Sequence, residues 1–87
     1  MNTSYHRKFD KQFKKLTVSV QKQFKERRNI FLSDQFHPLL DNHPLNPPFA
    51  GSRSINVTGD YRAIFKHISP DLVLFTHIGT HHELFGT

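Results

Sequence analysis

The chain has 87 residues, of which 36% are hydrophobic and 22% charged, with nine Phe and no Cys. This length suits one small domain over residues 1–87, and packed side chains must stabilise it because no disulfide is available. The missing cysteines exclude thiol nucleophiles and cysteine zinc sites, and they favour a reducing compartment such as the cytoplasm. No stretch approaches the roughly 18 apolar residues of a membrane span, and the N-terminus lacks a signal-peptide core, so we expect no membrane partner.

The positive charge is concentrated at one end of the sequence. Residues 1–28 hold nine of the twelve Lys and Arg but two of the seven acidic residues, whereas residues 29–87 hold six of the seven His. A basic region of this kind is typical of proteins that contact nucleic acid, although it is also typical of a solvated helix face.

Helical periodicity characterises the first third of the chain. A short strand is expected to end at Ser4 or Tyr5, and the Thr17 hydroxyl is suited to cap a second helix. Apolar residues recur at helical spacing in two groups: Phe9, Phe13 and Leu16, then Val20, Phe24 and Phe31. The pattern predicts two amphipathic helices that form a hairpin.

The rest of the chain indicates a sheet. Residues 33–51 are rich in Pro, Asp and Asn and predict an ordered connector, after which residues 52–58 alternate with period two. Turn residues at 58–60 and 69–71 separate two further strands, over 61–67 and 72–78, and a brief helical coil is expected near the C-terminus. The fold class is therefore α+β, with an N-terminal helical hairpin packed on a small curved antiparallel β-sheet.

Candidate chemistry lies at the predicted strand ends and loops. No Gly-rich phosphate loop, nucleophile elbow or zinc-protease motif occurs. The remaining polar candidates are His43, Asp60, Arg62, His77, His81 and His82. Such residues can cleave RNA without a metal, because the reaction needs a base for the 2′-hydroxyl, a cation for the phosphate and an acid for the departing oxygen. Each is also common in turns or on solvated faces, and adjacent His81 and His82 seldom bind one ion, so we expect no metal and no cofactor.

Five short motifs occur in order: His43-Pro44-Leu45, Gly51-Ser52-Arg53, Gly59-Asp60-Tyr61-Arg62, Ile78-Gly79-Thr80-His81 and Leu84-Phe85-Gly86. Together they resemble the RelE/ParE superfamily of bacterial toxins, most closely its YafQ-like branch, over nearly the whole chain. The resemblance implies a RelE-like fold and a cytoplasmic type II toxin. It also implies an endonuclease that cuts mRNA in the decoding site of the small ribosomal subunit and is silenced by a cognate antitoxin. The basic helices would then contact ribosomal RNA phosphates.

The resemblance also implies roles for single residues. His81 matches the terminal catalytic histidine, expected to be the general acid, while Asp60 and His43 are the two candidates for the base. Arg62 resembles an arginine that faces the scissile phosphate. The expected substrate-binding residues are Tyr61, Phe85, His77 and Arg53.

The sequence departs from the branch at two positions. Asn56 stands where the branch has a histidine, and His77 stands where it has an arginine. Because guanidinium stays protonated, Arg62 is expected to replace the lost charge.

Two other functions stay open at this stage. A ParE-like poison of DNA gyrase would share the scaffold but have no need for His81, Asp60 and His43 together. A plain RNA-binding module would use the basic helices and Tyr61 without catalysis.

Overall fold

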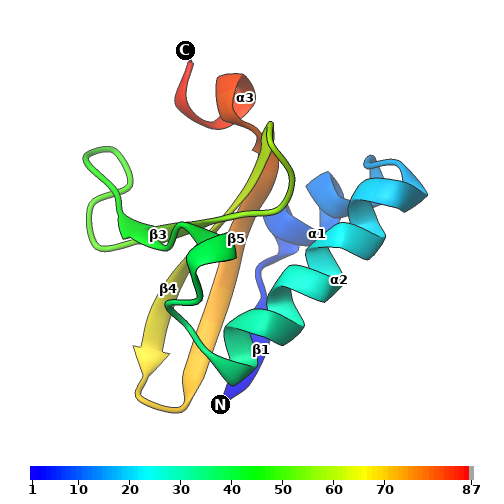
Figure 1. Cartoon of the computed structure of the whole chain (residues 1–87). Coiled ribbons are helices and arrows are strands. Elements are labelled where there is room, and N and C mark those ends of the chain that lie inside the picture. The colour runs from blue at the N-terminus through cyan, green and yellow to red at the C-terminus, as the bar shows by residue number, and fades with distance from the viewer. Residues whose placement is uncertain (87) are drawn as a thin grey trace.

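A five-stranded sheet carries two helices on one face and a third, short helix at one end (Figure 1). The structure is a computed structural model and describes residues 1–86. The elements in chain order are β1 (Asn2–Tyr5), α1 (Arg7–Lys14), α2 (Val18–Ser33), the 3₁₀ helix η1 (Pro38–Leu40), β2 (His43–Pro44), β3 (Arg53–Asn56), β4 (Tyr61–Ser69), β5 (Leu72–Thr80) and α3 (His81–Phe85). This arrangement confirms the predicted α+β class.

The helical hairpin forms as its periodicity predicts. The Thr17 hydroxyl caps α2 by accepting a hydrogen bond from the Val20 amide at 3.3 Å. The Gln21 side chain closes the turn between α1 and α2, because its amide donates to the carbonyls of Phe13 and Leu16. The predicted short first strand likewise ends at Tyr5.

The sheet has the order β1-β5-β4-β3-β2, and the meander β3–β4–β5 is antiparallel as predicted. It is extended by a parallel edge strand, because β1 pairs with β5 from Asn2↔Leu72 to Tyr5↔Phe75. The sequence predicted the strand but not its partner, since four polar or aromatic residues carry no register signal. The connector also contains more structure than expected, namely η1 and the two-residue β2, which pairs with β3.

An aromatic core lies between the helical hairpin and the sheet. Phe9, Phe24, Phe31, Phe65 and Phe75 are at most 2% exposed and contact one another with ring centroids 4.9 to 6.1 Å apart. Each such side chain contributes about 1.5 to 3 kcal/mol by burial, which is how a chain without cysteine achieves stability. Within residues 1–86, no helix is long and apolar enough to span a membrane.

Helix α3 is fixed to the end of β5 by its cap. Thr80 and Glu83 form a reciprocal capping box, with the Thr80 amide donating to Glu83 at 2.8 Å and the Glu83 amide donating to Thr80 at 3.1 Å. Gly79 permits this close packing, because a Cβ there would lie 3.2 Å from the Glu83 carboxylate. The helix ends at Phe85 and is capped by Gly86, whose φ of 72° suits glycine.

Candidate active site

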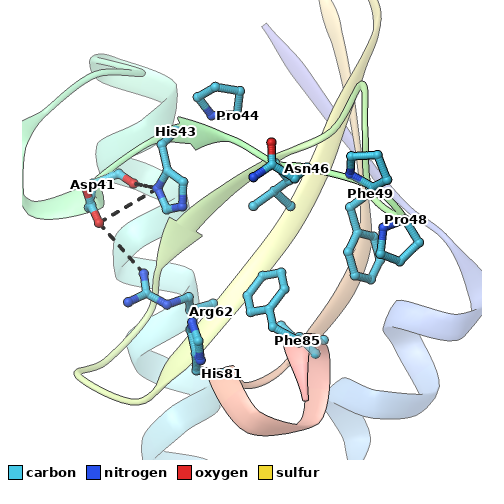
Figure 2. A pocket seen from close by; sticks show the side chains of 12 residues that line it. Asp41, His43, Pro44, Asn46, Pro48, Phe49, Arg62, His81 and Phe85 are labelled. Carbon is cyan, nitrogen blue, oxygen red and sulfur yellow. Dashed lines mark hydrogen bonds and ion pairs between the residues drawn. The ribbon is translucent and has the colours of Figure 1, made fainter. Parts of the chain in front are cut away.

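A cavity of about 600 Å³ opens between the connector, β4 and α3 (Figure 2). Its lining residues are Asp41, His43, Pro44, Leu45, Asn46, Pro47, Pro48, Phe49, Arg62, His81, Leu84 and Phe85. Figure 2 shows His43, Arg62 and His81 along one side and Phe49 and Phe85 opposite them. Four of the eight predicted site residues therefore line one cavity: His43, Arg62, His81 and Phe85. Its volume lies in the range of small-molecule sites.

The His43 ring is held by the connector. His43 opens β2 and pairs with Ser54 on β3, while its Nδ1 lies 2.7 Å from the backbone carbonyl oxygen of Asp41. Because a carbonyl oxygen only accepts, Nδ1 carries the proton in this bond and the neutral ring keeps Nε2 as an acceptor. That is the protonation state a general base requires.

Arg62 is anchored on β4. It pairs with Asn56 on the neighbouring strand β3, and its NH1 donates a hydrogen bond to the Asn56 side-chain oxygen. Asn56 and Arg62 alternate with the core residues Ile55 and Ala63, so both side chains lie on the other face of the sheet. The Asp41 carboxylate lies 3.9 Å from the same NH1, and the Arg62 side chain is 20% exposed. A guanidinium held in this way is suited to bind phosphate oxygens.

His81 is placed by α3 and by the neighbouring turn. It is the first residue of the helix, and its backbone amide donates to the Asp60 carbonyl at 3.0 Å. Its ring contacts the Phe85 ring at a centroid distance of 4.9 Å. An exposed imidazole at the rim of the cavity is suited to exchange protons with a bound substrate.

Asp60 lies outside the cavity lining. It is exposed in the turn between β3 and β4, where the Thr58 hydroxyl accepts hydrogen bonds from the amides of Asp60 at 3.2 Å and Tyr61 at 3.0 Å. Asp60 therefore contacts the site through the backbone of His81. Of the two candidates for the base, the geometry favours His43.

Three predicted substrate-binding residues also lie behind or beside the cavity. Tyr61 packs against the hydrophobic core. The Nε of Arg53 donates to the Asn42 side chain at 2.7 Å, which supports the connector just before His43. The His77 ring contacts the ring of Phe49, with ring centroids 5.2 Å apart.

Burial is the main cause that lowers the pKa of His77, with smaller contributions from Lys8 and His6. A lowered pKa favours the neutral form of the His77 ring. Among the residues that line the cavity, Arg62 carries the permanent positive charge, because a guanidinium stays protonated.

No pattern in the sequence predicted the position of Asp41 or the wall of the cavity. Asp41 was one of several turn-forming residues in the connector, and nothing in a pattern of Pro, Asp and Asn indicates which carboxylate faces a site. The wall comes from the connector segment 44–49, which α3 meets through Leu84 and Phe85. A signal was available in the segment 44–49, which is apolar except for Asn46.

No model of a protein family and no curated protein sequence matches the chain. Solved structures do match. YafQ from Escherichia coli strain BL21(DE3) is 25% identical over 98% of both chains, with a TM-score of 0.77. The chain belongs to the RelE/ParE superfamily of toxins, close to YafQ.

Two further structures agree with this membership. YafQ in the E. coli DinJ–YafQ toxin–antitoxin complex is 25% identical over 98% of this chain and 97% of its own, with a TM-score of 0.74. The YoeB/ParE toxin from Agrobacterium tumefaciens shares the fold, with a TM-score of 0.77 at 14% identity over 93% of this chain and 99% of its own. The resemblance stated from the sequence motifs and the RelE-like fold are thus confirmed, and the likeness supports a type II toxin.

Proposed function

We propose that this chain is the toxin of a type II toxin–antitoxin pair and cleaves mRNA in the decoding site of the bacterial ribosome. The observation that carries the proposal is the convergence of His43, Arg62 and His81 on one cavity from β2, β4 and α3. These residue types supply the three roles that RNA cleavage requires.

The cleavage step assigns one role to each group. His43 Nε2 takes the proton of a 2′-hydroxyl, whose oxygen attacks the adjacent phosphorus. The Arg62 guanidinium binds the phosphate oxygens as negative charge accumulates on them. His81, in its protonated form, donates a proton to the 5′ oxygen as the phosphorus–oxygen bond breaks. The products are a 2′,3′-cyclic phosphate and a 5′-hydroxyl, and the step needs no cofactor or metal.

The apolar side of the cavity supports the binding of a base. Phe49 and Phe85 meet edge to face with ring centroids 5.9 Å apart, beside Pro48. Aromatic faces of this kind stack on nucleobases, typically contributing about 1 to 3 kcal/mol per base. In this proposal Asp60, Tyr61, Arg53 and His77 support the site from outside the cavity lining.

The surface charge supports the two macromolecular partners. Exposed lysines cover α1 and α2, namely Lys8, Lys11, Lys14, Lys22 and Lys25. Such a surface matches the phosphates of ribosomal RNA. The structure of YafQ bound to DinJ supports a cognate antitoxin as the partner of this chain.

The test is primer extension on an mRNA held by programmed ribosomes, with and without the purified protein, and on the same mRNA without ribosomes. We expect a new 3′ end in the decoding site only when both ribosome and protein are present. His81→Ala should abolish the cut. The matched control is His82→Ala, because His82 is an exposed neighbour on α3 that does not line the cavity.

Two outcomes would overturn the proposal. Intact message together with inhibited DNA supercoiling would indicate a gyrase poison. Intact message with retained ribosome binding would indicate an RNA-binding module without catalysis.

A further inference from the structure

Asp41 has an unusual backbone conformation at the edge of the cavity. It follows η1 as its C-terminal cap with φ 46° and ψ 48°, and within residues 1–86 it is the only residue other than glycine with positive φ. The left-handed region costs most residues about 1 kcal/mol or more, and Asp and Asn tolerate it best after Gly. A conformation of this kind persists where the surrounding structure imposes it, and it concentrates at functional sites.

The left-handed turn at Asp41 accompanies a contact with His43. The Asp41 carbonyl oxygen accepts the hydrogen bond from His43 Nδ1 at 2.7 Å, and the Asp41 carboxylate lies 3.8 Å from the same nitrogen. The His43 side chain is 43% exposed, so neighbouring side chains alone do not confine its ring. The hydrogen bond to the Asp41 carbonyl therefore orients the His43 ring.

The same carboxylate faces Arg62. The Asp41 Oδ2 lies 3.9 Å from Arg62 NH1, which also donates to Asn56, and Arg62 Nε is buried without a partner of its own. One residue thus links the two groups that the cleavage step uses first (Figure 2).

We propose that Asp41 is a positioning residue, whose backbone carbonyl fixes His43 as the Nδ1-protonated tautomer and whose carboxylate holds Arg62 beside it. Its effect on cleavage rests on the proposed function. The tautomer of His43 is a property of the free protein and is measured without any activity.

Three variants separate the contribution of the Asp41 carboxylate from that of its backbone carbonyl. Asp41→Asn keeps a residue that tolerates the left-handed conformation and removes the charge. Asp41→Gly keeps the conformation and the carbonyl but removes the side chain. Asp41→Val strongly disfavours the left-handed conformation and so displaces the carbonyl.

The first readout is the ¹⁵N NMR spectrum of protein labelled at histidine, at about pH 8.5 where imidazole is neutral. His43→Gln assigns the signals. We expect His43 to be Nδ1-protonated in the wild type, Asp41→Asn and Asp41→Gly, and to approach the mixture of a free histidine in Asp41→Val. Thermal melting confirms that each variant is folded.

The second readout is ribosomal cleavage. We expect a loss in kcat of about 10²-fold for Asp41→Val, as for a misplaced catalytic group, and a smaller, equal loss for Asp41→Asn and Asp41→Gly. A wild-type His43 protonated at Nε2 would overturn the inference even if Asp41→Val does not fold. So would a folded Asp41→Val with the tautomer and cleavage of the wild type. An Nδ1-protonated His43 with no cleavage by any protein would overturn the proposed function instead, and leave the positioning of His43 standing.

Discussion

Arg62 donates a hydrogen bond to the side chain of Asn56, the residue directly opposite it on β3. From the resemblance, a histidine is expected at the position that Asn56 occupies. An amide cannot exchange a proton, but it can hold a guanidinium in place. Asn56 therefore holds the Arg62 guanidinium instead of supplying a group that titrates.

Asn56→Ala should release Arg62. Arg62 already has one buried nitrogen without a partner, so the loss of the Asn56 acceptor leaves a second part of a largely buried charge unsatisfied. We expect a loss of about 1 to 3 kcal/mol in the free energy of unfolding, and a lower rate of ribosomal cleavage. Urea denaturation and single-turnover primer extension measure the two effects.

Asn29→Ala is the matched control for this change. Asn29 also accepts a hydrogen bond from an arginine, Arg28, but at 3.5 Å and in an exposed position on α2. Its removal should leave both quantities nearly unchanged. Equal effects of Asn56→Ala and Asn29→Ala would show that the anchor of Arg62 has no special importance.

The choice between His43 and Asp60 as the base is open to a direct comparison. His43 lines the cavity, whereas Asp60 lies in an exposed turn and only its backbone carbonyl contacts the site, by accepting the His81 amide. We expect His43→Gln to reduce kcat by about 10²- to 10⁴-fold, the usual contribution of a general base. Asp60→Asn keeps the backbone contact and should retain most of the activity. The reverse order of the two losses in primer extension would assign the base to Asp60.

The sequence predicted elements whose signal is local and missed relationships that depend on tertiary contacts. The helical hairpin follows from the helical spacing of apolar residues within each helix, such as Phe9 and Phe13 in α1, and the meander follows from alternation and turn residues. In the site, the motifs indicated His43, Arg62, His81 and Phe85, which do meet. They did not indicate that Tyr61 packs on the core, beside Ala63 and Phe65 on the same face of β4. Nor did they indicate that Asp41 faces Arg62, because that depends on how the connector folds over the sheet.

Thr80 links the stability of α3 to the geometry of the site. Its hydroxyl accepts the amide of Glu83, and the helix that it caps carries His81 and Phe85. Thr80→Ala should cost about 1 kcal/mol of stability and let the five-residue helix fray, so that cleavage falls as well. Hydrogen exchange of the α3 amides and primer extension measure these effects.

Thr17→Ala is the control, because it removes an equivalent cap from α2 and should cost similar stability without a loss of cleavage. A cleavage defect of equal size in both variants would mean that α3 has no particular role.

The lowered pKa of His77 makes the stability of the protein depend on pH. In the unfolded chain His77 takes up a proton as the pH falls through its ordinary value of 6.5, whereas burial beside Lys8 and His6 delays this in the folded state. The unfolded state then binds more protons, so the contribution of His77 is complete above about pH 6.5 and declines as the pH falls toward the folded pKa.

Urea denaturation midpoints between about pH 8 and pH 5 measure this dependence. We expect the midpoint of His77→Gln to fall less steeply than that of the wild type, because glutamine has no proton to take up. His82→Gln is the control for the loss of an exposed histidine. Identical slopes for His77→Gln and the wild type would mean that another group causes the pH dependence of stability. His77 would then take up a proton in the folded protein as readily as in the unfolded chain.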